Sequence, residues 1–298
     1  MCGIVGLFLK NPELEPRLGE MLSQMLGVLS DRGPDSAGFA IYGDGDAGRV
    51  KLTLRSDTGA SLAGVGPDVA QALGIDDASR LRDTHLVVSA PREREGDVRD
   101  WLARERPDIR VVGSGTRMEI FKEVGLPPDV AARFRLEQMS GTHAIGHTRM
   151  ATESAVTTKG AHPFSTGADQ CLVHNGSLSN HNAVRRTLGR EGLSFETDND
   201  SEVAAGYLTW RMREGDSLGE ALDHGLADLD GFYTFVVGTE SGFAVLRDPI
   251  SCKPAVMAET DDYVAFGSEY RALASLPGIE AARVFEPEPA TVYAWERA

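Results

Sequence analysis

The stretch MCGIVGLF, at residues 1–8, places one of the chain's three cysteines directly behind Met1 and ahead of an apolar run. The run is rich in β-forming residues and punctuated by glycine, so it predicts a buried strand. Initiator methionine is generally removed when the second residue is small, which would leave Cys2 at the N-terminus. The Cys2 α-amine, with a reference pKa of about 7.7–8, could then act as general base for its own thiol. The alternative interpretation is a small buried hydrophobic residue, the usual state of a free cysteine.

The residues that follow predict a helix, a tight turn and a second strand. The tetrapeptide Arg32-Gly33-Pro34-Asp35 combines a glycine, a proline of fixed φ and an Asx residue, which is typical of a turn. The run GFAIYG at residues 38–43 then predicts a strand. Before the turn, hydrophobic residues recur at helical spacing: Leu14, Leu18, Met21, Leu22, Met25 and Leu29.

The rest of the chain alternates short strand patterns with a few helical ones. The segment DSEVAAGYLTWRM predicts a helix opened by a capping residue, and Ser217 and Glu220 have capping-box spacing. The last third contains one strand pattern after another. This order favours an α+β fold of antiparallel sheets covered by helices. We expect a single domain over residues 1–298, with a family-variable insertion at about 51–138.

Composition excludes several classes of function. The chain has 298 residues, 41% hydrophobic and 25% charged, as expected of a soluble globular protein. Its formal charge of -15 would repel phosphate backbones, so we expect no nucleic-acid partner. It has no apolar stretch long enough for a membrane helix and no signal-peptide pattern, so we expect no membrane association. Three widely spaced cysteines indicate a reducing compartment, and we expect a cytoplasmic protein.

Metal and nucleotide sites are also disfavoured. His143 and His147 are four residues apart, but their surroundings predict an extended strand, where such residues lie about 13 Å apart. The chain contains no HExxH motif and no cysteine cluster. Its glycine-rich stretches lack the phosphate-loop spacing. We therefore expect no metal and no nucleotide in this chain.

Four other residues supply what a cysteine would need to attack a zwitterionic amide. Asn175 and Gly176 could donate hydrogen bonds to an oxyanion. Arg149 could bind an α-carboxylate and Asp200 an α-amine. Each also has a plainer interpretation: Asn175 and Gly176 as a turn, Arg149 as a surface ion pair and Asp200 as a helix N-cap.

Together the motifs MCGIVG, DRGPDSAG, HTRMAT, AHPF, HNG, DSE, RDPISCKP and FGSE occur in the order seen in class II glutamine amidotransferases. The chain resembles this family from nearly end to end. The family belongs to the N-terminal nucleophile (Ntn) hydrolases. The resemblance implies a four-layer αββα sandwich, in which two antiparallel sheets lie between layers of helices.

The resemblance also implies roles for individual residues. Cys2 would attack the side-chain amide of L-glutamine, release ammonia and form a thioester that water hydrolyses. Asn175 and Gly176 would form the oxyanion hole. Arg149 would hold the substrate α-carboxylate, and Asp200 its α-amine.

Three further positions match the family near this site. His174 and His162 would line the substrate-binding region. Arg32 would organise the turn beside the nucleophile without acting in the chemistry.

Two departures from the sugar-transferring members concern the branch of the family. Met150 stands where those members usually have an aromatic residue, and the stretch of about 85 residues before GTHAIGHTRMATES is longer than in the shorter members. Both features resemble the glutamate-synthase branch, including the amidotransferase-like subunit of N-methylglutamate synthase. The motifs leave no room for an acceptor-binding domain. The implied partner is therefore a synthase subunit that carries flavin and an iron–sulfur cluster and receives the ammonia, while this chain has no cofactor.

Two other functions stay open at this point. The chain could be a non-catalytic assembly subunit of such a synthase. It could also be an Ntn amidase of other specificity, although such an enzyme would not need the zwitterion-binding pair of Arg149 and Asp200.

Overall fold

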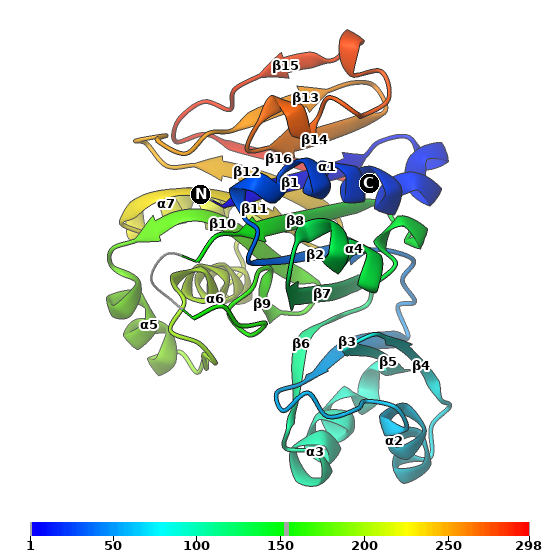
Figure 1. Ribbon diagram of the computed structural model, residues 1–298. Helices are drawn as coiled ribbons and strands as arrows, with labels where there is room; N and C mark the ends of the chain where they lie inside the picture. The colour runs from blue at the N-terminus through cyan, green and yellow to red at the C-terminus, as the bar shows by residue number, and fades with distance from the viewer. Residues whose placement is uncertain (1, 152–154, 298) are drawn as a thin grey trace.

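Two antiparallel sheets stack face to face in the computed structural model, which describes residues 2–151 and 155–297 (Figure 1). Met1, whose removal is predicted, and the threonine of the HTRMAT motif lie outside the described residues. The larger sheet has seven strands in the order β15-β13-β14-β1-β8-β2-β7. In chain order they are β1 (Gly3–Leu9), β2 (Ser36–Tyr42), β7 (Met118–Val124), β8 (His143–Arg149), β13 (Val256–Glu259), β14 (Tyr263–Gly267) and β15 (Arg283–Phe285).

The smaller stacked sheet has five strands in the order β16-β12-β11-β10-β9. Their bounds are β9 (Phe164–Gly167), β10 (Gln170–Leu178), β11 (Gly231–Gly238), β12 (Gly242–Arg247) and β16 (Val292–Glu296). The last-third strand patterns of the sequence thus divide between the two sheets. Of the described strands in the last third, the three-residue β15 had no counterpart among the predicted patterns, and β7 and β9 earlier in the chain were missed as well.

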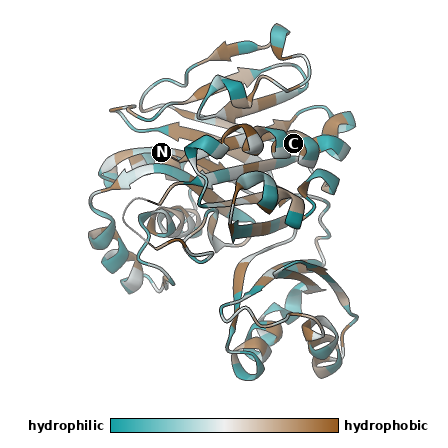
Figure 2. Ribbon diagram, in the orientation of Figure 1, coloured by the Kyte–Doolittle hydropathy of each residue, from teal (hydrophilic) through white to brown (hydrophobic). Residues whose placement is uncertain are grey.

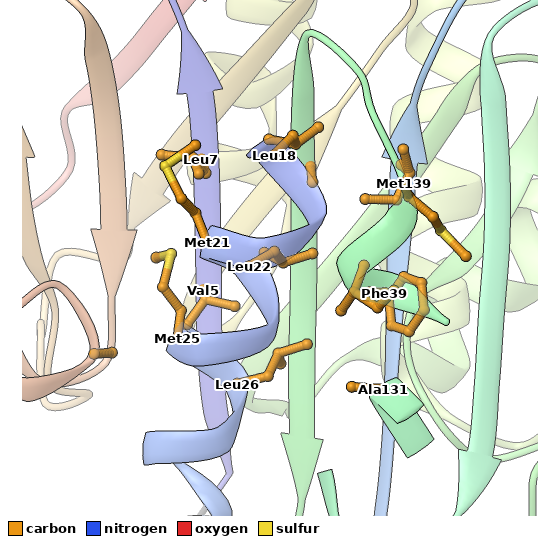
Figure 3. Close-up of a cluster of buried hydrophobic side chains, with 14 of the residues drawn as sticks. Val5, Leu7, Leu18, Met21, Leu22, Met25, Leu26, Phe39, Ala131 and Met139 are labelled. Atoms are coloured by element: carbon orange, nitrogen blue, oxygen red, sulfur yellow. The ribbon is translucent and has the colours of Figure 1, made fainter. Parts of the chain in front are cut away.

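The strand that opens the chain is buried on both faces. Because side chains alternate along a strand, Val5 and Leu7 pack against helix α1 (Leu18–Val28), while Ile4 and Phe8 enter the core between the sheets. Figure 3 shows the α1 side of this arrangement. Two buried faces explain why the sequence is continuously apolar instead of alternating.

Helices cover the outer faces of the stack. Beside α1, helix α4 (Pro127–Arg133) lies against the larger sheet. Helices α5 (His181–Arg190), α6 (Asp200–Arg213) and α7 (Leu218–Asp228) cover the smaller sheet. The exposed α5 is mostly hydrophilic (Figure 2). The capping box of Ser217 and Glu220 is present at α7, but the N-cap of α6 is Asn199 and not Asp200.

A separate lobe lies between β2 and β7. Its four-stranded sheet, in the order β4-β5-β3-β6, packs with two helices around a hydrophobic cluster of its own. The lobe elements are β3 (Arg49–Ser56), α2 (Val65–Leu73), β4 (Ala78–Arg82), β5 (His85–Pro91), α3 (Glu95–Glu105) and β6 (Ile109–Gly115). Residues 118–138 lie outside this lobe, in β7, α4 and a 3-10 turn. That the insertion varies within the family stays a prediction.

Short 3-10 helices complete the chain, at Pro12–Arg17, Ser30–Arg32, Arg92–Arg94, Leu136–Gln138, Tyr270–Ala272 and Ile279–Ala281. No helix among the described residues is long and apolar enough to cross a membrane.

Candidate active site

Cys2 lies at the start of β1, where the two stacked sheets meet the surface. Its carbonyl oxygen accepts hydrogen bonds from Arg32 Nε at 3.1 Å and Asn175 Nδ2 at 3.3 Å. Its Sγ lies 4.0 Å from the carbonyl oxygen of Met150. The residue is partly exposed, so the thiol is accessible while its backbone is held by side chains from distant parts of the sequence.

Arg32 is fixed on the other side by an acidic residue. Its guanidinium forms an ion pair with Glu269, just after β14. The hydrogen bond from Arg32 holds the pKa of Glu269 below its usual range, and Arg271 contributes in the same direction. The predicted organising role of Arg32 therefore has a structural basis, and Glu269 is a partner that sequence analysis did not single out within FGSE.

The turn that carries Arg32 is pressed against β8. A Cβ on Gly33 would lie 2.3 Å from the carbonyl carbon of Thr148, so only glycine fits there. The backbone amide of Asp35 donates to the Arg149 carbonyl at 3.0 Å, and the Asp35 carboxylate accepts from the Ala151 amide at 2.8 Å. Through these contacts the DRGPD motif fixes the backbone of the segment that contains Arg149.

Arg149 is the last residue of β8 and pairs with Ser36 in the sheet. Its side chain is buried, and it donates from Nη1 to the Ala155 carbonyl at 3.4 Å. Arg149 is therefore a buried residue and does not lie on the surface. Its predicted role toward an α-carboxylate stays a prediction.

Asn175 and Gly176 lie inside strand β10, which overturns their interpretation as a plain turn. They pair with Thr234 and Tyr233 of β11. Gly176 has φ of +149°, and a Cβ there would lie 2.0 Å from the Phe232 carbonyl oxygen. The strand is therefore distorted at a position that only glycine tolerates. The distortion lies next to the amide that reaches Cys2.

Asp200 opens α6 beside β10. One carboxylate oxygen accepts from the Leu178 amide at 2.9 Å, and the other lies 3.8 Å from His174 Nδ1. The same His174 nitrogen lies 2.9 Å from the Ser201 hydroxyl. Burial lowers the pKa of His174, and the Asp200 carboxylate opposes this effect. The Asp200 side chain is partly exposed and can still meet a ligand.

His162 is buried between His147 of β8 and the backbone of β10. Its ring stacks on His147 with centroids 4.0 Å apart, and its Nδ1 accepts from the His174 amide at 3.3 Å. His147 in turn contacts the His174 carbonyl through Nε2 at 3.2 Å. Burial lowers the pKa of both rings. The stack supports the strand that carries Asn175, whereas the predicted substrate contact of His162 stays a prediction.

Among the described residues, no group of three or more His, Cys, Asp or Glu side chains is placed to hold a metal ion. His143 and His147 both lie on β8, as their extended pattern predicted.

Known proteins show the same sequence pattern over the full chain. The family pattern of the glutamine amidotransferase domain matches residues 147–275. The glutamine amidotransferase-like protein GlxB of Rhizobium meliloti (strain 1021) is 63% identical over 297 residues, which cover 99% of this chain and 98% of that protein. The chain belongs to the class II glutamine amidotransferases. It is an enzyme of the N-terminal nucleophile hydrolase type.

Some of the more distant members of the amidotransferase family are longer. The amidophosphoribosyltransferase of Archaeoglobus fulgidus is 32% identical over 296 residues, which cover 98% of this chain but 48% of that protein. A solved structure of the allosteric regulatory enzyme of purine biosynthesis covers 99% of this amidotransferase with a TM-score of 0.63 at 20% identity. That likeness confirms the predicted fold of two antiparallel sheets between helical layers.

Proposed function

We propose that this amidotransferase is a glutaminase subunit that passes ammonia to a partner synthase. The observation that carries the proposal is the position of Cys2, whose carbonyl is bound by both Arg32 and Asn175. Asn175 belongs to the smaller stacked sheet and lies 173 positions along the chain from Cys2, yet its side chain reaches the backbone of Cys2 at the start of the larger sheet's β1. Such convergence is expected where a reactive atom must be held in place.

In the proposed reaction the Cys2 thiol gives its proton to its own α-amine, and Sγ bonds to the side-chain carbonyl carbon of glutamine. Asn175 Nδ2 and the Gly176 amide stabilise the resulting oxyanion. Collapse of this intermediate breaks the carbon–nitrogen bond, and the ammonium group returns its proton to the leaving nitrogen as ammonia departs. Water then hydrolyses the thioester, which releases glutamate and restores the thiol.

Substrate selection rests on two charged residues, Arg149 at the end of β8 and Asp200 at the start of α6. Arg149 would bind the α-carboxylate and Asp200 the α-amine of glutamine. A simple acyl amide has neither group, so this pair favours an amino-acid substrate over an acylase substrate. His174, in contact with Asp200, would keep that carboxylate oriented.

The acceptor of ammonia would be bound by another polypeptide. The chain covers 98% of GlxB but 48% of the Archaeoglobus amidophosphoribosyltransferase, so about half of that longer protein has no counterpart here. We place the partner in the glutamate-synthase or N-methylglutamate-synthase class, with flavin and an iron–sulfur cluster in the partner subunit. Met150 in place of an aromatic residue supports this branch.

The test combines mass spectrometry with labelling by a glutamine-like diazoketone. Active protein should lack Met1 and carry the label on Cys2. Cys252 is exposed, so Cys252→Ala is the matched control and should keep both label and activity. Retention of Met1 in active protein would contradict the mechanism, because the Cys2 nitrogen would then be an amide without basicity. Protein that stays inert toward glutamine even with its partner would instead favour a scaffold role.

A further inference from the structure

A cavity of about 250 Å³ lies away from Cys2, where the lobe meets the smaller stacked sheet. Its walls come from β3 and β6 of the lobe, from β7, β9 and the segment around Lys159, and from α6 with the chain before it. None of the residues proposed above for glutamine hydrolysis lines it. Its volume is slightly below the usual range for drug-sized ligands, so it suits a small metabolite.

The walls of this cavity are cationic in a protein whose formal charge is -15. Five basic side chains and three acidic ones line it: Arg55, Arg110, Lys122, Lys159 and Arg213, against Asp57, Glu196 and Glu202. A local excess of positive charge against the overall balance indicates a site for an anion.

The buried acidic residue of the wall is already satisfied. Glu202 accepts hydrogen bonds from the amides of Glu196 and Thr197 at 2.8 and 2.7 Å, and from the Thr197 hydroxyl at 2.6 Å. Asp57 lies 2.9 Å from Arg110 and 3.4 Å from Arg55. Within the described part of the chain, Lys159 and Arg213 have no acidic side chain at ion-pair distance.

Lys122 is the least ordinary member of the wall, because its side chain is only 5% exposed. Its ammonium donates to the carbonyls of Ala161 at 2.8 Å and Pro163 at 3.2 Å, and lies 4.6 Å from the centre of the Phe164 ring. An ammonium has three N–H groups, so one remains beyond these two carbonyls. Burial of this charge is costly and lowers the Lys122 pKa to about 8, although Glu202 and Glu196, neither of them at ion-pair distance, partly oppose that shift. A bound anion would offset that cost.

We propose that this cavity binds a small metabolite through an oxyanion group, either a phosphate or a carboxylate pair. Lys122 would hold the anion at the buried end, and Arg213 and Lys159 would close on it from the surface. The planar guanidinium of Arg213 suits either oxyanion.

The experiment titrates the purified full chain with inorganic phosphate and, separately, with succinate, at constant ionic strength set with chloride. We expect saturable binding of one molecule per chain by calorimetry. The double variant Lys159→Gln, Arg213→Gln should weaken it by at least about tenfold. Both side chains lie outside the hydrophobic clusters, so the variant should fold. Arg104→Gln, on the exposed face of α3, is the matched control and should bind as the wild type does.

The two anions distinguish the source of the oxyanion. Binding of phosphate alone identifies a phosphate ester, and binding of succinate alone identifies a dicarboxylate. The proposal is overturned if neither anion binds saturably, or if the double variant binds as tightly as the Arg104→Gln control. Glutaminase activity is not part of this readout, so the result is independent of the function proposed for Cys2.

Discussion

The side-chain amide of Asn175 reaches Cys2, since its Nδ2 donates to the Cys2 carbonyl oxygen at 3.3 Å. If it stabilises the oxyanion, Asn175→Ala should lower kcat for glutamine hydrolysis by about 10²–10³. The measurement is steady-state release of ammonia. Asn182→Ala, on the exposed face of α5, is the control and should leave kcat unchanged. A normal rate in Asn175→Ala protein would remove this residue from the oxyanion hole.

Gly176 makes a second prediction, about backbone conformation. Gly176→Ala places a methyl group against the Phe232 carbonyl at a φ of +149°, so we expect a loss of about 1–3 kcal/mol in the free energy of unfolding. Gly189→Ala, in α5 with open space around its Cβ position, should be neutral or stabilise the protein by about 0.4–1 kcal/mol. Urea denaturation compares the two. Equal stabilities would show that the strand relaxes around Gly176.

For some site residues the sequence predicted the chemical role, whereas for others it did not predict the conformation or the partner. Asn175 and Asp200 were found because their side-chain chemistry suits a zwitterionic amide. The conformation of Gly176 was missed because glycine after a polar residue usually marks a turn, and only the pairing with β11 keeps the chain extended. Glu269 was missed as a partner because its contact with Arg32 spans 237 residues.

At the scale of elements, the strand and helix at the N-terminus could be predicted, whereas the lobe was predicted only as an insertion at about 51–138 and not as a sheet of its own. The run Gly3–Leu9 and the spaced leucines and methionines of α1 carry strong local patterns, because both elements bury continuous apolar faces. Strands β3 and β4 of the lobe contain several basic residues, and β4 has no buried residue. Its sheet depends on pairing of β3 with β5 and β6, which no local pattern reveals.

The ion pair between the turn after α1 and the end of β14 makes a prediction about pH. Arg32 lowers the folded-state pKa of Glu269, so the pair stabilises the fold above the usual glutamate pKa and loses its effect as pH falls through the lowered value. Glu269→Gln should therefore cost on the order of 1 kcal/mol at neutral pH and less in acid.

Thermal denaturation from neutral to acidic pH checks this difference. The control is Glu280→Gln, an exposed glutamate that should show the wild-type dependence on pH. A destabilisation by Glu269→Gln that stays constant across the pH range would mean that packing, and not charge, accounts for it.

At the scale of the whole molecule, buried histidines should make the fold sensitive to acid. His85 joins the lobe to the sandwich by edge contact with Phe134, while His143 and His147 lie in β8. Burial lowers the pKa of each of these three rings to about 3. Below the unfolded-state value of about 6.5, the unfolded chain binds protons that the folded chain does not. Stability is therefore full above about pH 6.5 and is lost as pH falls toward 3.

The slope of that loss can be measured by urea denaturation between about pH 6.5 and 5. Each buried ring contributes up to about 1.4 kcal/mol per pH unit, once pH is well below its unfolded pKa. His143→Gln should reduce the slope by about the contribution of one ring. The variant should also lower the stability at neutral pH, because it removes the contact with Thr239. Asn182→Ala, on the exposed face of α5, removes no titrating group and is the control that should leave the slope unchanged. A wild-type slope in the His143→Gln protein would show that this ring takes up its proton without unfolding, and the acid sensitivity would then belong to the other buried groups.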